Sequence, residues 1–223
     1  MLHLLHAFID LVLHLDRHLV ELMADYGSWI YGILFVVIFA ETGLVVTPFL
    51  PGDSLLFALG ALAALDTQGT LSAPGLWALL ALAAVLGNLA NYSIGRAIGA
   101  HAFSGRYRLI NVAYLRRTEE YFKRHGAATI ALSRFAPILR TFAPFVAGIG
   151  HMPYGRFIAY NLVGGASWVG LFIWGGYLFG NLPVVRGNFG LVTLGIVFVS
   201  LLPMAVMLLK DRAAARRAGA APV

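Results

Sequence analysis

Three apolar stretches of the chain, residues 67–95, 157–185 and 187–209, contain no Asp, Glu, Lys or Arg. Each is longer than the ~20 residues that a helix needs to cross a bilayer. We therefore expect three transmembrane helices. Two pairs of glycines spaced four residues apart predict close helix packing. Gly95 and Gly99 lie at the end of the first stretch, and Gly176 and Gly180 lie within the second.

Two further apolar regions, near residues 26–60 and 126–150, are interrupted by charge, proline and glycine. Proline breaks a helix, and freed backbone groups cannot face lipid, so such segments occur at membrane depth only where protein or a wet cavity covers them. We interpret them as re-entrant hairpin loops in corresponding positions of two halves, which is typical of an inverted repeat. The residues that we expect to break these helices are Pro48, Pro51, Gly52, Pro137, Pro144 and Gly148.

The N-terminal residues 1–25 mix apolar side chains with nine charged or histidine residues, too many for a membrane-spanning helix. We interpret this segment as an amphipathic helix at the membrane interface rather than a signal peptide. The spacing of Asp10, His14 and His18 would allow metal ligation, but nothing else in the chain completes a ligand set, so we expect no metal. The predicted division is an interfacial helix at 1–25, a membrane domain at 26–209 and a basic tail at 210–223.

Basic residues gather in two places, between residues 96 and 124 and in the tail after residue 209. The positive-inside rule puts both on the cytoplasmic side, and the apolar stretches 157–185 and 187–209 supply the two crossings between them. On this topology both termini are cytoplasmic. The hairpin that carries Asp53 then enters from outside and the hairpin that carries Arg134 enters from the cytoplasm, so the two approach from opposite faces.

Composition supports the same class. Hydrophobic residues make up 60% of the 223 residues and charged residues 12%, against about a quarter in soluble domains. This excludes a soluble enzyme, and the charge of +6 needs no nucleic acid, because its distribution follows the membrane rule. Without cysteine there is no disulfide and no thiolate chemistry. The predicted fold is an all-α integral membrane protein, a helical bundle with two opposed re-entrant hairpins.

Four charged residues, Glu41, Asp53, Arg134 and Arg140, lie inside the interrupted segments. Each costs at least about 2.5–3.5 kcal/mol at the bilayer centre, and opposite charges that meet recover much of this. We therefore expect the four side chains to share one water-accessible pocket. A purely structural quartet is the alternative, although buried ion pairs are weak evidence for stability.

The chemistry of these groups suits a phosphate-bearing ligand. An arginine fork binds two phosphate oxygens at once, and Pro137 allows Arg134 and Arg140 to point at one anion. Burial favours a neutral acid and a neighbouring arginine favours a carboxylate, so Glu41 and Asp53 are candidate proton carriers. Two amides in the stretch 67–95, Asn88 and Asn91, are possible polar groups of the cavity or ordinary helix contacts. No cofactor is expected.

The motifs FLPGDSLLF at residues 49–57 and SRFAPILRTFAPFVAG at residues 133–148 resemble the DedA family of bacterial inner-membrane proteins, within the VTT-domain (SNARE-associated Golgi) superfamily. The resemblance covers roughly residues 26–180. It implies a membrane-embedded pair of re-entrant loops and movement of lipids across the bilayer that depends on the proton-motive force, with undecaprenyl phosphate or a glycerophospholipid such as phosphatidylethanolamine as substrate. The family's acidic pair matches Glu41 and Asp53, and its arginine pair matches Arg134 and Arg140. Many members carry an acid at the position of Asn88.

We predict a multi-pass lipid translocase of the bacterial inner membrane, with lipid and protons as its partners and no nucleic acid. A membrane-organising protein without transport is the main alternative. A lipid-phosphate enzyme is a weaker alternative, because the histidines after residue 25, His101, His125 and His151, lie in no phosphatase motif. The sequence is compatible with a homo-oligomer. It does not distinguish which lipid moves, in which direction, or with how many protons.

Overall fold

The computed structural model describes residues 15–44, 52–67, 69–102, 126, 128–135, 137–196 and 198–199, and these ranges contain helices and turns without a strand. The elements in chain order are α2 (Leu15–Tyr26), η1 (Gly27–Trp29), α3 (Ile30–Gly43), α4 (Gly52–Leu65), α5 (Ala73–Ala102), α7 (Ala128–Leu132), η2 (Ser133–Phe135), α8 (Pro137–Ile149), α9 (Tyr154–Phe179) and α10 (Pro183–Gly187). The predicted helical class is confirmed.

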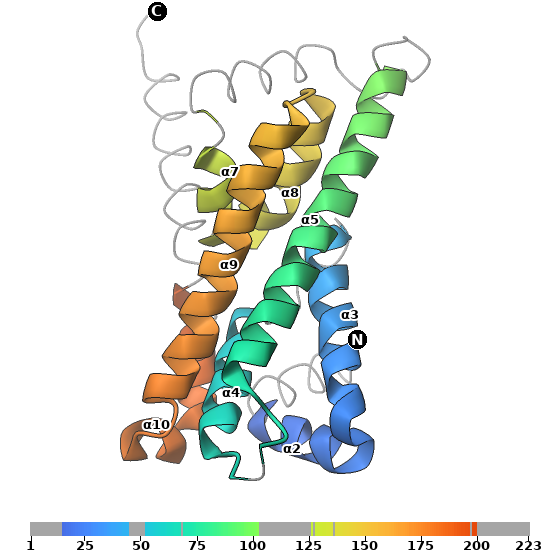
Figure 1. Cartoon of the computed structure of the whole chain (residues 1–223). Helices are drawn as coiled ribbons and strands as arrows, with labels where there is room; N and C mark the ends of the chain where they lie inside the picture. The colour runs from blue at the N-terminus through green and yellow to red at the C-terminus, as the bar shows by residue number, and fades with distance from the viewer. Residues whose placement is uncertain are drawn as a thin grey trace, which may run out of the picture.

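Two long helices, α5 and α9, lie side by side and run in opposite directions through the length of the bundle (Figure 1). Their segments Ala73–Ile98 and Tyr154–Phe179 are long and apolar enough to cross a membrane. They correspond to two of the three predicted transmembrane helices. In the third, residues 189–196 are helical, and residue 197 and those from 200 onward lie outside the described part.

Both long helices differ at their ends from the predicted spans. The first begins at Ala73 rather than at residue 67, because Ser72 caps it by accepting from Gly75 N at 3.3 Å and the preceding loop is fixed by Asp66, which accepts from Leu71 N. The second ends at Phe179 rather than at residue 185, because proline disfavours a helical conformation in the residue before it, and Leu182 before Pro183 is extended.

The remaining helices form two pairs at opposite ends of the bundle. The first pair, α3 and α4, lies in the lower half of Figure 1 and the second pair, α7 and α8, lies in the upper half. In the first pair α3 packs on α5 and α4 on α9; in the second pair α7 packs on α9 and α8 on α5. Each pair therefore touches both long helices, but the first helix of one pair packs on α5 and the first helix of the other pair packs on α9.

Glycines permit the closest of these contacts. A side chain at Gly60 on α4 or Gly176 on α9 would collide with the backbone of the facing helix, and the same holds for Gly95 on α5 and Gly148 on α8. Close backbone approach through small residues is the usual mode of helix packing in membranes. The spacing of Gly95 and Gly176 predicted part of this set.

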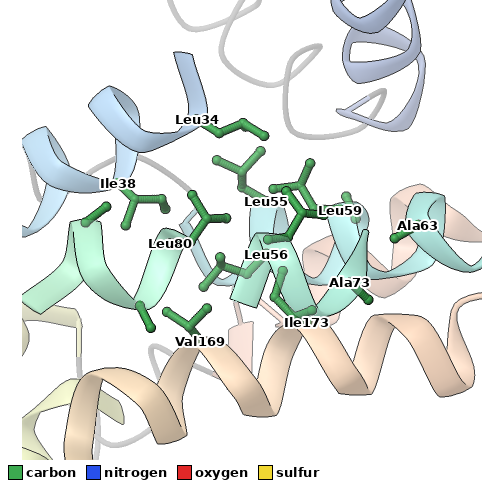
Figure 2. Close-up of a cluster of buried hydrophobic side chains, with 14 of the residues drawn as sticks. Leu34, Ile38, Leu55, Leu56, Leu59, Ala63, Ala73, Leu80, Val169 and Ile173 are labelled. Carbon is green, nitrogen blue, oxygen red and sulfur yellow. The ribbon is translucent and has the colours of Figure 1, made fainter. Parts of the chain in front are cut away.

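A hydrophobic core lies where α3, α4, α5 and α9 converge (Figure 2). Its central side chains, which are nearly free of solvent contact, are Leu34, Ile38, Leu55, Leu56, Leu59, Leu80, Val169 and Ile173. A smaller cluster at the other end centres on Tyr92, which stacks on Phe157 at 4.2 Å and donates a hydrogen bond to the Met152 carbonyl.

Not every expected helix breaker acts as one. Pro137 begins α8 and Gly52 begins α4, whereas Pro48 and Pro51 lie outside the described residues. The predictions for Pro144 and Gly148 are wrong, because both lie inside α8. A proline inside a helix loses one hydrogen bond and crowds the carbonyl four residues earlier, and the packing of α8 against α5 compensates for this cost.

The N-terminal segment is helical from Leu15 to Tyr26, and residues 1–14 lie outside the described part. Its position at the membrane interface and the division of the chain near residues 25 and 210 stay predictions. The same holds for the re-entrant character of the two pairs and for the inverted repeat.

Candidate functional site

Arg140 on α8 binds two carboxylates from the first pair. Its Nη1 donates to Asp53 Oδ1 at 2.6 Å, and its Nη2 donates to Glu41 Oε1 at 2.5 Å. The exposed fractions of Glu41, Asp53 and Arg140 are 0, 8 and 3%. We call this three-residue arrangement the Arg140 clasp. It ties together three segments that are far apart in the sequence.

Helix ends bring these side chains together. Glu41 lies in the last turn of α3, and Asp53 lies in the first turn of α4, where unpaired backbone N–H groups favour a negative charge. Arg140 lies in the first turn of α8, where the same effect disfavours a positive charge. The two carboxylates therefore compensate both for the burial of the guanidinium and for its position in the helix.

Trp168 on α9 completes the clasp. Its Nε1 donates to Asp53 Oδ1 at 2.9 Å, and its ring centroid lies 4.6 Å from the guanidinium carbon of Arg140. The same ring lies 6.0 Å from the guanidinium carbon of Arg134. One indole thus contacts both arginines, and cation–π attraction is strongest when the groups are desolvated.

Arg134 in η2 is held in a different way. Only 1% of it is exposed, and no carboxylate lies within ion-pair distance of it in the described part of the chain. Its Nη2 donates to Asn161 Oδ1 at 2.6 Å and to the Ala84 carbonyl at 3.1 Å. Its Nη1 is buried and has no hydrogen-bond partner among the described residues.

The two amides of α5 have separate contacts. In the orientation that satisfies both ends of Asn88, its oxygen accepts from Arg134 Nε at 3.2 Å and Nη2 at 2.9 Å, and its nitrogen donates to the Thr42 carbonyl at 3.3 Å. Asn91 donates to the Thr141 carbonyl at 2.7 Å, beside Arg140 in the chain. Asn88 therefore contacts an arginine, and Asn91 joins α5 to α8.

The structure brings Glu41, Asp53 and Arg140 into direct contact and places Arg134 at the same indole. Sequence reasoning missed Asn161 and Trp168, which lie on one face of α9 with their side chains buried. Two signals could have found them. Asn161 is an amide inside an uncharged apolar span, where polar groups are expensive, and Trp168 lies deep in the span rather than at its ends, where tryptophan is enriched.

The four charged residues are closed off from solvent, with at most 8% of the surface of any of them exposed. This differs from the predicted water-accessible pocket. Charges are buried without water only when their own contacts compensate the loss of hydration, as the Arg140 clasp does. The structure therefore presents the site in a closed form.

The comparisons with known proteins agree with the fold and with the composition. The VTT domain matches residues 50–178, a range that includes Asp53, Arg134, Arg140 and Trp168. Protein DedA of Escherichia coli K12 is 50% identical over 216 residues, which cover 96% of this chain and 98% of that protein. An uncharacterized membrane protein of Mycobacterium leprae is 44% identical over 172 residues, covering 75% of this chain and 74% of its own.

The inner membrane protein YghB of Escherichia coli K12 is 33% identical over 201 residues, or 89% of each chain. No solved structure matches. The Mycobacterium leprae protein and YghB are named as membrane proteins, in line with the two helices of this chain that are long and apolar enough to cross a membrane. The matched domain covers more than half of the chain, so the chain belongs to the DedA family of VTT-domain membrane proteins.

Proposed function

We propose that the chain moves a phosphate-bearing lipid across the bacterial inner membrane and couples this movement to protons. The observation that carries the proposal is the buried Arg140 clasp beside Arg134. Intramembrane ionisable groups usually mark a substrate or ion path, and a guanidinium fork suits a phosphate. Undecaprenyl phosphate and glycerophospholipids share this chemistry.

Exchange of partners at Arg140 would provide the coupling. A lipid phosphate that binds the arginines displaces the carboxylates of Glu41 and Asp53, which are then buried without a counterion. A buried, unpaired carboxylate takes up a proton, because its charged form is too costly. The four charges sum to zero in the closed form, so a neutral cluster requires one proton for each negative charge that the headgroup brings.

The packing of the helices supports two further parts of the proposal. In the first pair the first helix packs on α5 and the second on α9, and in the second pair the first helix packs on α9 and the second on α5. An inverted repeat in which α3, α4 and α5 correspond to α7, α8 and α9 would give this pattern. The pairs lie at opposite ends of the bundle (Figure 1), as re-entrant hairpins from opposite membrane faces would. The site between their tips could then open to either side in turn.

The test is lipid movement in vesicles that contain the purified protein. Labelled undecaprenyl phosphate and labelled phosphatidylethanolamine are followed separately between the leaflets, with and without an imposed pH gradient. We expect transport of at least one lipid to respond to the gradient, and Glu41→Gln to lose that response. The matched control is Glu21→Gln, because Glu21 lies on the exposed side of α2.

A rate indifferent to the gradient would reject proton coupling. Absence of transport for both lipids would favour a membrane-organising protein, and release of inorganic phosphate from either lipid would favour an enzyme. The phosphate-release assay is therefore run on the same vesicles.

A further inference from the structure

The two arginines of the site differ in how their charge is compensated. Arg140 donates to two carboxylates, so its charge is more than balanced locally. Arg134 donates to an amide of α9, an amide of α5 and a backbone carbonyl, all of them neutral. Neutral acceptors fix the orientation of a guanidinium and leave its positive charge in place.

This arrangement is expensive for a residue with only a structural role. Burying a charge that bonds no counterion is costly, and Arg134 is 1% exposed. The Glu41 carboxylate attracts Arg134 electrostatically but bonds Arg140 instead. One of the nitrogens of Arg134, Nη1, also lacks a hydrogen-bond partner within the described residues. Arg140 Nε lacks one as well, but two carboxylates already bind that guanidinium. An unsatisfied, positively charged donor in a closed site is what an anion would bind.

We propose that Asn161 is a positioning residue that holds Arg134 as the first anion-binding group of the site. This inference rests on the proposed function, and it assigns unlike roles to the two arginines: Arg134 is ready for a phosphate oxygen, whereas Arg140 becomes available only when the clasp opens. Gly165, one turn after Asn161 on α9, keeps side-chain atoms away from the guanidinium. A methyl group there would lie 3.3 Å from Arg134 Nη2.

The identity of residue 161 separates this role from a structural one. An aspartate has nearly the same shape as an asparagine, and at 2.6 Å from Arg134 Nη2 it would form a buried ion pair. If residue 161 served the fold alone, aspartate would preserve the contact to Arg134 better than a shorter serine, and both would lose the hydrogen bond that Asn161 Nδ2 donates to the Val85 carbonyl at 3.0 Å. If it positions a charged Arg134 for an anion, aspartate would cancel that charge and serine would not. The two roles therefore predict opposite rankings.

The experiment measures anion binding through Trp168, which lies against both arginines. The chain has four tryptophans, and replacing Trp29, Trp77 and Trp174 by phenylalanine leaves Trp168 as the single reporter. The purified protein in detergent is titrated with dihexanoyl phosphatidate. Dihexanoyl glycerol, which lacks the phosphate, and inorganic phosphate, which lacks the tails, are titrated in parallel. Thermal unfolding is recorded for every variant.

We expect Asn161→Asp to weaken phosphatidate binding at least about tenfold and Asn161→Ser to weaken it by no more than about threefold. Asn88→Asp should act as Asn161→Asp does, because it brings a carboxylate to the same guanidinium from α5. Both aspartate variants should fold, since each gains an ion pair with Arg134 in place of one hydrogen bond from its amide nitrogen to a backbone carbonyl. Binding of dihexanoyl glycerol should be unchanged in all variants.

Equal or tighter phosphatidate binding by Asn161→Asp than by Asn161→Ser would overturn the inference, and so would loss of folding in both aspartate variants. Response to inorganic phosphate alone would identify the site as one for the phosphate group rather than for the whole lipid. Failure of the proposed function is visible separately. It would appear as absent lipid transport by the unsubstituted protein in vesicles, with the ranking of the variants in the binding assay intact.

Discussion

At the level of single residues, the Arg140 clasp depends on geometry as well as charge. Two nitrogens of one guanidinium reach two carboxylates on different helices, and a lysine has a single ammonium that cannot reproduce this fork. We expect Arg140→Lys to lower lipid transport in vesicles at least about tenfold, although the charge is retained. Arg96→Lys is the matched control, because Arg96 is exposed and uses one nitrogen to bond Tyr92. Equal transport by both variants would contradict the fork argument.

Trp168 combines two contacts that substitution can separate. Trp168→Phe keeps a ring against Arg140 and removes the Nε1–H that donates to Asp53. Loss of a hydrogen bond to a charged group should lower the free energy of unfolding by about 1.5–3 kcal/mol. Trp77→Phe removes an indole hydrogen bond to a neutral backbone carbonyl, so about 0.5–1.5 kcal/mol is expected there. Chemical unfolding in detergent measures both, and a larger loss for Trp77→Phe would contradict the assignment.

The sequence predicted the charged residues of the site because each is costly inside an apolar segment. The same reasoning could not predict how they pair, since two acids and two bases allow several arrangements. It treated Arg134 and Arg140 alike, whereas the structure gives both acids to Arg140 and neutral amides to Arg134. The asymmetry depends on Asn161, whose orientation toward Arg134 follows from the rotation of α9 and not from any local pattern.

At the level of helices, the contact between α4 and α9 depends on a glycine on the face of α9 that packs against α4. A methyl group at Gly176 would meet the backbone of α4 at Phe57, while a methyl group at the neighbouring Gly175 would have no atom within 4 Å. Gly176→Ala should therefore force the two helices apart and lower the thermal unfolding temperature by several degrees. Gly175→Ala should be neutral or stabilising by up to about 1 kcal/mol through helix propensity. Similar unfolding temperatures for the two variants would argue against close approach at Gly176.

Hydropathy found the helices more reliably than it found their ends. The apolar stretch 67–95 begins before α5 because its first residues form an uncharged loop, which hydropathy does not distinguish from a helix. The Ser72 cap at the start of α5 is a single hydrogen bond, and no hydropathy average detects it. Pro144 shows the opposite error, since a strong local signal for a break is outweighed by packing against α5. Ends are set by single hydrogen bonds and contacts, whereas spans are set by many residues together.

At the level of the whole molecule, the distribution of basic residues and the packing lead to the same arrangement. Outside the site, Arg96 and Arg156 lie toward the upper end of the bundle in Figure 1, at the end of α5 and the start of α9, whereas Arg17 in α2 and Arg186 in α10 lie toward the lower end. The excess of basic residues is at the upper end, because seven of the sixteen Lys and Arg occur in the sequence between residues 96 and 124, from the last turns of α5 onward. The positive-inside rule assigns that end to the cytoplasm. The closed state of the site could not be read from the sequence, because closure depends on how the two pairs meet and not on which residues they carry.

This orientation can be tested directly because the chain contains no cysteine. Thr67, in the exposed loop between α4 and α5, and Gly155, exposed at the start of α9, lie at opposite ends of the bundle (Figure 1). Neither substitution changes a charge, so Thr67→Cys and Gly155→Cys leave the topological signal intact. In intact spheroplasts a membrane-impermeant maleimide should label Thr67→Cys, while Gly155→Cys should react only after the membrane is permeabilised. The reverse pattern would invert the topology and, with it, the face from which each helix pair enters. Labelling of both variants before permeabilisation would mean that the two ends do not lie on opposite sides of the membrane.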